Sequence, residues 1–428
     1  MLDRKYILEN VEAVKQNCRH RGVGENVDRL VELESQRRQR LAEAEEFNRQ
    51  ANEVSRKIGP ARDHAEREQL KEQGRQLRQQ KETAQQQHDT LEQEILSLQK
   101  QLPNMAHPEA PVGDDDAANR EIARSPREPR NFDFQPLDHL ELGENHGWID
   151  FEGGARTTGS GFYFLGGELV LLDLALQRYA IERLMEFGFR PAVTPDLALD
   201  SVLEGIGFMP RGPETQVYSI ENSDLSLVGT AEITLGGWYR NQTVMADQLP
   251  IRICGISHCY RTEAGAAGRA SRGLYRVHQF TKVEMFAFTT PDASDTMLDE
   301  LLNIERDLFD GLEIPYRVVD TATGDLGGPA FRKFDLEAWM PGRGEGGQWG
   351  EVTSTSNCTD YQARRLNARY KVPDKKGTRF VHTLNGTAIA NSRALIAVLE
   401  NHQNADGSVT IPEALRPYLG RDLIGQPD

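Results

Sequence analysis

Hydrophobic residues between positions 28 and 102 recur in alternating steps of three and four, which is the spacing of helices that pack along one seam. Gly59 and Pro60 interrupt the pattern near its middle, and proline cannot continue a helix. Residues that are not hydrophobic take several seam positions, namely Arg37, Arg40, Gly74, Lys81 and His88. We therefore expect residues 28–102 to form an antiparallel hairpin of two long helices.

Heptad spacing is also typical of dimerisation coiled coils and of simple spacers. The many arginines of the hairpin could instead follow a phosphate backbone, but residues 1–100 hold 19 basic and 19 acidic side chains and carry no net charge. The formal charge of −16 therefore lies in the rest of the chain. An acidic body disfavours nucleic-acid binding through bulk charge and leaves such contact to local patches or to the neutral hairpin.

The periodicity changes beyond Pro103. Residues 103–130 are polar, contain several prolines and have no period, which indicates a linker. Residues 167–186 show helical hydrophobic spacing, and short strand patterns follow them. The length of 428 residues favours two or three domains. We expect an N-terminal helical domain over residues 1–104 and a mixed α+β domain over residues 105–428.

Residues 251–288 read as two strands joined by a loop rich in glycine and alanine. Because successive strand side chains point to opposite faces, one face of the second strand carries Phe280, Lys282, Glu284 and Phe286. Four arginines lie in or beside the loop: Arg261, Arg269, Arg272 and Arg276.

Planar guanidinium groups suit phosphate oxygens, an aromatic ring can stack on a nucleobase, and glycines let a backbone approach a ligand closely. A carboxylate beside them suits a cationic amine. The strand pair therefore indicates a site for a nucleotide and an amine. The alternative is an exposed basic hairpin with a core phenylalanine and a structural salt bridge.

No run of about 18 apolar residues occurs, so we expect no membrane span. The first ten residues carry charges without an apolar segment behind them, unlike a secretory signal. The cysteines lack paired metal-ligand spacing and are Cys18, Cys254, Cys259 and Cys358. We expect a cytoplasmic protein whose cysteines are reduced and mostly buried.

Five segments then match one known family in order: GFRPAVTPDLA, GTAEITL, CYRTEAGAAGRASRGLYRVHQFTKVEMF, GEVTSTSNCTDYQARR and LNGTAIANSRALIAVLENHQ. With the hairpin before them, they make the chain similar to the bacterial-type seryl-tRNA synthetases over nearly its whole length. That family belongs to the class II aminoacyl-tRNA synthetases. Neither GxGxxG after a strand nor GxxxxGK[ST] occurs, so ATP would be held without a dinucleotide fold or a P-loop.

The resemblance implies a catalytic domain built on a mainly antiparallel β-sheet flanked by helices, behind a long two-helix coiled-coil arm. It implies motif 1 at about residues 176–199 with Pro195, motif 2 at about 251–288 and motif 3 at about 381–402. It also implies a homodimer through motif 1, an arm that binds tRNA(Ser), and ATP, Mg²⁺ and L-serine as ligands. The implied reaction forms seryl-adenylate and then seryl-tRNA, releasing AMP and diphosphate, with tRNA(Sec) as an additional candidate substrate.

Position by position, the resemblance implies two groups of binding residues. The ATP group is Arg261, Thr262, Glu263, Arg276, Phe280, Glu351, Val352, Thr353, Ser354 and Arg393. The serine group is Thr230, Ala231, Glu232, Arg261, Glu284, Asn385 and Thr387. Arg261 and Arg393 would be catalytic, and Glu351 and Ser354 would contact Mg²⁺ together with ATP.

Within these groups, Arg261 would hold the α-phosphate, while Arg276 and Arg393 would clamp the triphosphate. Adenine would stack on Phe280 and be read by Glu263. We expect Glu284 to serve the amino acid rather than a salt bridge.

The chain departs from the commonest family pattern at two positions. Thr387 stands where serine is most frequent, and Ser392 stands where glycine is common, which leaves the fine shape of the pocket open. Two other functions remain open at this point: a ligase that loads an amino acid onto a carrier protein, and a catalytically inactive synthetase paralogue. The long hairpin disfavours the first, and the presence of Arg261, Glu284, Glu351 and Arg393 disfavours the second.

Overall fold

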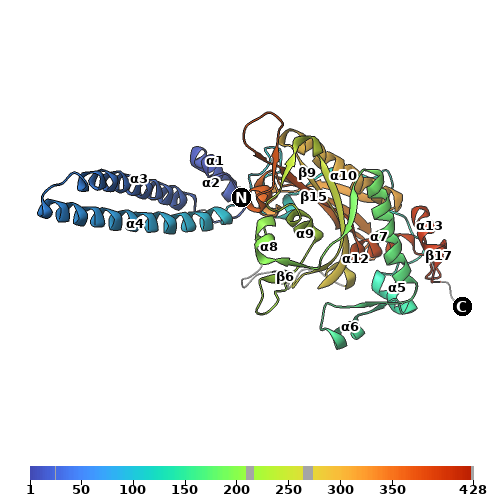
Figure 1. The fold of residues 1–428 in the computed structure, drawn as a ribbon. Helices are drawn as coiled ribbons and strands as arrows, with labels where there is room; N and C mark the ends of the chain where they lie inside the picture. Colours follow the sequence, from blue (N-terminus) through green and yellow to red (C-terminus); the bar gives the residue numbers. More distant parts are fainter. Residues whose placement is uncertain (25, 209–215, 264–272, 426–428) are drawn as a thin grey trace. The chain divides into compact units, whose positions relative to one another are not determined.

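The computed structural model describes residues 1–24, 26–208, 216–263 and 273–425. The chain divides into two compact units, residues 1–105 and 106–428 (Figure 1). The loop arginines Arg269 and Arg272 lie outside the described residues.

The first unit is helical, and its two longest helices run side by side as an antiparallel hairpin (Figure 1). Its helices are α1 (Arg4–Glu9), α2 (Val11–His20), α3 (Val27–Ile58) and α4 (His64–Gln101). Asp63 starts α4 by accepting the backbone N–H of Glu66 at 3.0 Å, which satisfies one of the free donors of the first turn. The predicted coiled-coil hairpin is therefore confirmed.

The seam of the hairpin is hydrophobic at most positions and polar where the sequence pattern placed polar residues. Leu33, Ala44, Ala84 and Ile95 are buried along it. Near the middle of α3, Arg37 Nη1 lies 2.9 Å from His88 Nε2 on the opposite helix. At the base, α1 and α2 cover a cluster formed by Ile7, Val14, Cys18, Leu30, Leu33, Ile95 and Leu102.

The second unit is built on an eight-stranded sheet in the order β1-β10-β11-β12-β15-β9-β8-β4. All neighbours are antiparallel except β4 and β8, which are parallel. The strands are β1 (Arg120–Arg124), β4 (Arg190–Val193), β8 (Ile251–Tyr260), β9 (Gln279–Thr289), β10 (Tyr316–Asp320), β11 (Arg332–Met340), β12 (Gln348–Asn357) and β15 (His382–Ala390). This mainly antiparallel sheet confirms the predicted fold class.

Helices and small sheets surround the large sheet. The helices are α5 (His139–His146), α6 (Phe151–Thr157), α7 (Glu168–Glu186), α8 (Asp200–Ile206), α9 (Ala231–Gly237), α10 (Ser294–Gly311), α11 (Tyr361–Leu366), α12 (Asn391–His402) and α13 (Arg416–Leu419). The short strands are β2 (Ile149–Asp150), β3 (Phe164–Leu165), β5 (Leu197–Leu199), β6 (Leu225–Leu227), β7 (Thr243–Met245), β13 (Arg369–Lys371), β14 (Arg379–Phe380), β16 (Val409–Thr410) and β17 (Leu423–Ile424).

The two faces of the sheet pack against different sets of helices. On β9, Val283, Met285 and Ala287 belong to the large core that includes α7, α10 and α12. The alternate residues Phe286 and Phe288 belong to a second core with α8, α9 and α11. The side chains of β9 therefore alternate between two cores, as a period of two requires.

All four cysteines are buried and free, as predicted. Among the described residues, no helix is long and apolar enough to cross a membrane.

The arm contains one strongly buried carboxylate whose charge should affect its stability. Glu34 is 3% exposed, and hydrogen bonds from Arg37 lower the pKa of its carboxyl from about 4.5 to about 2, although burial opposes this shift. A lowered pKa stabilises the fold above the unfolded value, and this stabilisation is lost as the pH falls from about 4.5 towards 2.

We predict that Glu34→Gln destabilises the arm by about 2 kcal/mol at neutral pH. The loss should be much smaller near pH 2, where the pKa of Glu34 lies in the folded arm. Hydrogen exchange of α3 and α4 in the full chain measures this difference at the two pH values. The matched control is Glu53→Gln, because Glu53 forms an exposed pair with Arg49 and should change protection little. Equal loss of protection in both variants would contradict the prediction.

Candidate active site

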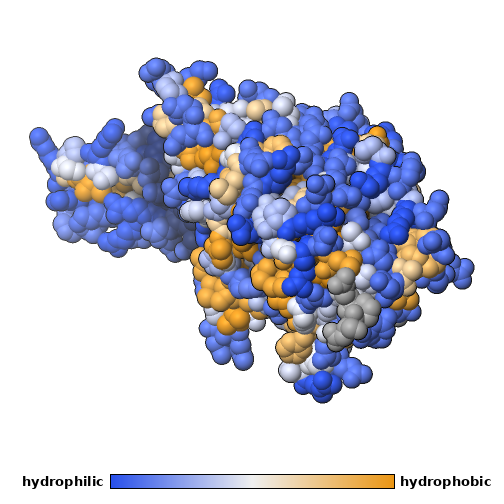
Figure 2. All heavy atoms as spheres, turned by 90° about the vertical axis from the view of Figure 1, so that its right-hand side faces the viewer, coloured by the Kyte–Doolittle hydropathy of each residue, from blue (hydrophilic) through white to orange (hydrophobic). Residues whose placement is uncertain are grey.

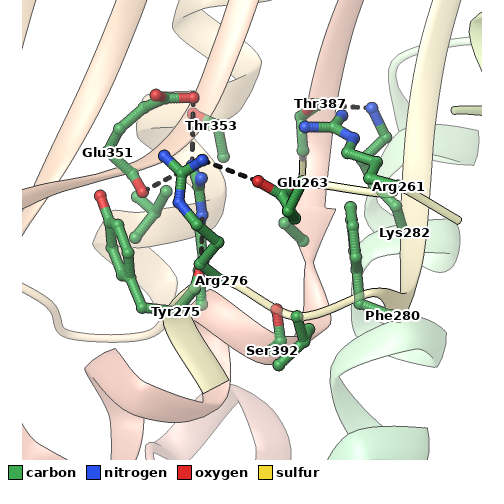
Figure 3. A pocket seen from close by; sticks show the side chains of 14 residues that line it. Arg261, Glu263, Tyr275, Arg276, Phe280, Lys282, Glu351, Thr353, Thr387 and Ser392 are labelled. Atoms are coloured by element: carbon green, nitrogen blue, oxygen red, sulfur yellow. Dashed lines mark hydrogen bonds and ion pairs between the residues drawn. The ribbon is translucent and has the colours of Figure 1, made fainter. Parts of the chain in front are cut away.

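Two adjoining cavities open at the same end of β8, β9, β12 and β15. Their volumes are about 570 Å³ and 100 Å³, and the smaller one is drawn in Figure 3. Both are lined by Arg261, Glu263, Arg276, Lys282, Glu351 and Thr387. Most of the residues predicted from the sequence are thus brought together around one space.

An irregularity in β12 places two of the predicted ligands on one face. Glu351 and Ser354 are three positions apart, so a regular strand would point them to opposite faces. The pairing with β11 shifts at Val352, since Glu337 pairs with Glu351 whereas Leu336 pairs with Thr353. This bulge restores a common face, and both Glu351 and Ser354 line the larger cavity.

Cationic side chains gather at one end of the site. Arg393, in the first turn of α12, donates Nη1 to Glu351 O at 3.0 Å and lies 3.1 Å from Glu351 Oε1. Burial alone would raise the pKa of Glu351, but the charges of Arg393, Lys333 and Arg261 outweigh it and hold this pKa below its usual value. The carboxylate of Glu351 is therefore ionised among cations.

The remaining predicted ATP residues form contacts of their own. Arg276 Nη1 lies 2.7 Å from Glu263 Oε2, and a dashed line marks this pair in Figure 3. The Arg261 guanidinium lies 5.3 Å from the centre of the Phe280 ring, a cation–π distance. Thr262 donates its backbone N–H to Gln216 O. Val352, Thr353 and Ser392 line the smaller cavity.

Carboxylates gather at the other end. Glu284 is 2% exposed, and Lys282 Nζ lies 2.5 Å from its Oε2. Thr387 Oγ1 donates to the same Glu284 oxygen at 3.3 Å and accepts from Lys282 Nζ at 3.4 Å. The expectation that Glu284 forms no salt bridge is wrong, because a lysine two positions earlier on the same strand face reaches it.

Glu232 is the second carboxylate of this end. The N-cap residue Thr230 accepts the Glu232 N–H at 3.2 Å and so sets the first turn of α9. Asn385 Nδ2 donates to Glu232 Oε1 at 3.0 Å. Ala231, predicted beside them, is fully buried and packs in the second core.

The pKa of Glu232 is raised to about 7 by burial and by the nearby charge of Glu284. Hydrogen bonding from Gln362 and the charges of Lys282 and Arg261 act in the opposite direction. Glu232 is therefore close to half ionised at neutral pH, and a cationic ligand would favour its charged form.

Several residues of the site were not predicted from the sequence. Tyr275 follows the loop, and its ring lies between Arg343 and Arg393, at 4.1 and 4.7 Å from their guanidinium carbons. The adjacent Leu274 N–H donates to buried His139 Nε2 at 3.2 Å, which fixes this segment. The sequence offered no signal for these residues. The alternation of side chains along a strand gave a signal only for Lys282, which it placed on the same face of the second predicted strand as Glu284.

Lys333 and Asp335 on β11 were also missed. They lie 3.0 Å apart, and Asp335 Oδ1 is buried without a hydrogen-bond partner among the described residues. Their strand lies outside the recognised segments of the sequence, so no motif spacing could have identified them.

The comparisons with known proteins agree with this geometry. Residues 216–402 match the tRNA synthetase class II core domain (G, H, P, S and T), and residues 1–106 match the seryl-tRNA synthetase N-terminal domain. The antiparallel sheet and its cavity are thus those of a class II aminoacyl-tRNA synthetase.

Relatives that align along the whole chain show which family of class II synthetases it belongs to. A serine--tRNA ligase of Rhodopirellula baltica is 63% identical and one of Rubrobacter xylanophilus is 57% identical, each covering 99% of both chains. The chain belongs to the seryl-tRNA synthetase family, whose members are ATP-dependent serine--tRNA ligases.

Solved structures agree with this placement. Seryl-tRNA synthetase from Pyrococcus horikoshii complexed with ATP is 39% identical, has a TM-score of 0.95 and covers 100% of both chains. The cytoplasmic serine-tRNA ligase of Naegleria fowleri in complex with AMP is 32% identical, has a TM-score of 0.88 and covers 99% of this chain and 98% of the other. None of these comparisons favours a carrier-protein ligase or an inactive paralogue.

The position of Tyr275 between two guanidinium groups yields a prediction. Replacing it by leucine removes the aromatic face, and we expect the KM for ATP to rise about 3- to 10-fold while the KM for serine stays within about twofold. Tyr275→Phe is the matched control, because it keeps the ring. Steady-state ATP–diphosphate exchange measures both constants, and a wild-type KM for ATP in Tyr275→Leu would contradict this role.

Proposed function

We propose that the chain activates L-serine by residues at the two ends of one cavity. The observation that carries this proposal is the distribution of charge: Arg393 lines only the smaller cavity, Glu232 and Glu284 line only the larger one, and Arg261 and Arg276 line both. ATP is a polyanion and serine carries an ammonium group, so opposite ends suit the two substrates.

At the ATP end, Arg261 holds the α-phosphate and Arg276 and Arg393 hold the β- and γ-phosphates. Glu263 reads adenine, which stacks on Phe280. The ion pairs of Arg276 with Glu263 and of Arg393 with Glu351 support this assignment indirectly, because they hold both guanidinium groups at the cavity wall. Binding of the triphosphate replaces carboxylate contacts by phosphate contacts of similar charge-assisted type.

At the serine end, Glu232 and Glu284 bind the ammonium, and Thr387 binds the hydroxyl together with Glu284. Asn385 orients Glu232 through its hydrogen bond. Alanine lacks the hydroxyl and would leave Thr387 and Glu284 without a ligand partner, a mismatch that can discriminate by about 10⁴. The Thr387 methyl group narrows the pocket against larger amino acids.

In the first step, a serine carboxylate oxygen attacks the α-phosphorus, and the bond from this phosphorus to the diphosphate oxygen breaks. Arg261 and Arg393 neutralise charge on the phosphates and align the two substrates, so no protein nucleophile is needed. In the second step, a ribose hydroxyl at the 3′ end of the tRNA attacks the serine carbonyl, and AMP leaves. No side chain is assigned as the base for that step.

Mg²⁺ fits the donors near Glu351. Hard cations prefer oxygen, and Mg²⁺ commonly takes one or two carboxylates together with substrate phosphates. Glu351 and Ser354 share one face, and the unpaired Asp335 Oδ1 lies on the strand beside them. When bound, the ion would neutralise phosphate charge. Glu351 and Ser354 would hold it, and Arg393 would shift from Glu351 to the phosphates.

The helical unit is proposed to bind tRNA(Ser), with tRNA(Sec) as a further substrate. The match of residues 1–106 to the family's N-terminal domain supports this role. The four free, buried cysteines suit a reducing compartment, so we place the reaction in the cytoplasm.

We also propose a homodimer through the surface of α7 and β4. Hydrophobic side chains gather on the face of the molecule drawn in Figure 2. Among the exposed ones, Leu174 and Met185 lie on α7, Phe164 lies on β3, and Val193, which is 82% exposed, lies on the edge strand β4. Exposed apolar residues beside an unpaired strand edge are typical of an interface.

The proposed role of Arg261 predicts the loss of adenylate formation in Arg261→Ala. Without its guanidinium, exchange of diphosphate into ATP should fall by about 10³-fold or more at saturating serine. Arg240→Ala is the control, because Arg240 bonds to Ser201 outside the cavity. Exchange within about tenfold of the wild-type rate in folded Arg261→Ala would refute the assignment.

The arm can be shortened without uncovering the cluster at its base. Ala44 and Ala84 are both buried in the hairpin, so residues 44–84 can be replaced by a short glycine-rich turn while the base cluster with α1 and α2 stays intact. We predict unchanged diphosphate exchange and a loss of tRNA(Ser) charging of about 100-fold or more, because phosphate contacts supply much of the tRNA affinity. Normal charging of tRNA(Ser) by the shortened chain would show that the arm is only a spacer.

A further inference from the structure

A fully buried glutamine lies behind the serine end of the cavity. Gln362, on α11, is 0% exposed. Its Nε2 donates to Glu232 Oε1 at 2.7 Å and to Ile206 O at 3.1 Å. Its Oε1 accepts from Thr383 Oγ1 at 2.7 Å. These bonds fix the orientation of the amide, because exchanging its oxygen and nitrogen would set Oε1 against two acceptors.

The same bonds determine which oxygen of Glu232 can meet a ligand. Oε1 accepts from both Gln362 and Asn385, at 2.7 and 3.0 Å. Among the described residues, both amide contacts of Glu232 go to this one oxygen, which leaves Oε2 available to the cavity. Two N–H donors on one carboxylate oxygen also favour its ionised form.

We propose that Gln362 is a positioning residue for serine binding. It holds Glu232 so that Oε2 meets the ammonium of the substrate, and it stabilises the carboxylate as an anion. Gln362 acts through Glu232 and does not touch serine. The inference therefore rests on the proposed role of Glu232 in binding the ammonium.

The surroundings of Glu232 make the ionised form sensitive to this hydrogen bond. Glu284 and Lys282 face it from β9, Arg261 from the end of β8, and Asn385 from β15. Burial and Glu284 raise the pKa of Glu232 to about 7, against the hydrogen bond from Gln362 and the two cations. Loss of the Gln362 donors raises this pKa further, so less of the anion exists at neutral pH.

The test uses the full chain with Gln362→Met, which lacks the donors, and with Gln362→Glu, which keeps the volume of the side chain and places a second carboxyl beside Glu232. ATP–diphosphate exchange is measured against serine from about pH 5.5 to 8.5, a range in which free serine keeps its ammonium charge. In the unaltered chain, kcat/KM for serine should decline about tenfold per pH unit below the midpoint near the pKa of Glu232.

In Gln362→Met, we expect the midpoint to move up by about one pH unit and the KM for serine at neutral pH to rise about fivefold, because the ionised fraction of Glu232 falls when a hydrogen bond to the charged group is lost. The kcat at saturating serine and the KM for ATP should stay within about twofold. Gln362→Glu should move the midpoint further, because a second carboxyl then faces Glu232. An unchanged midpoint in either folded variant overturns the proposal.

Two controls separate positioning from simple support of the fold. Thr383→Val removes the hydrogen bond that Gln362 Oε1 accepts but leaves the one that Gln362 Nε2 donates to Glu232, so the midpoint should not move; an equal shift there overturns the proposal. If both Gln362 variants fail to fold, the role of Gln362 is structural, and the proposal that it positions Glu232 is overturned.

Glu232→Gln tests the proposed function itself. A wild-type KM for serine in this variant would show that Glu232 does not bind the ammonium, and the proposed function would fail at this residue. A raised KM in Glu232→Gln with unshifted Gln362 variants would defeat the inference about Gln362 alone.

Discussion

Glu232 and Glu284 line the same cavity, and two neighbouring carboxylates can both stay charged in a buried place only if cations or hydrogen-bond donors compensate them. Lys282 lies 2.5 Å from Glu284, whereas the side-chain donors that the described residues place at hydrogen-bond distance from the Glu232 carboxylate are the amides of Gln362 and Asn385. The compensation is therefore unequal, and burial together with the charge of Glu284 raises the pKa of Glu232 to about 7. In the proposed function, the substrate ammonium supplies the missing positive charge, which links the electrostatics of the site to its choice of ligand.

The sheet is what brings these charges together. Lys282 and Glu284 come from β9, Asn385 and Thr387 from β15, and the two strands are paired neighbours in the centre of the sheet. Thr387 pairs directly with Glu284 in this register. The helices on the face of the second core then add Glu232 from α9 and Gln362 from α11. A shift of register between the strands would separate the hydroxyl from the carboxylate.

Features with a regular period could be predicted from the sequence. The heptads of residues 28–102 predicted the hairpin and placed Arg37 and His88 at its seam, where the structure shows them 2.9 Å apart. The period of two on β9 placed Lys282 and Glu284 on one face, although it could not show that they touch. Family resemblance supplied the residues of the cavity but not their partners.

Features that depend on irregular backbone or distant packing could not be predicted. The bulge at Val352 sets Glu351 and Ser354 on one face against the normal alternation, and nothing in the local sequence marks it. Gln362 reaches Glu232 across 130 positions of the chain. Glu263 and Arg276 pair although they are 13 positions apart, a spacing that matches no period of the sequence. Such contacts follow from tertiary structure and not from local spacing.

The most direct test of this account is a crystal structure of the chain with a non-hydrolysable seryl-adenylate analogue, in which a sulfamate stands for the acyl phosphate. The account predicts the serine ammonium within roughly 3 Å of Glu232 Oε2 and of the Glu284 carboxylate, the serine hydroxyl on Thr387, and the sulfamate on Arg261. An ammonium that contacts neither carboxylate would contradict the central claim that their charge selects the amino-acid substrate.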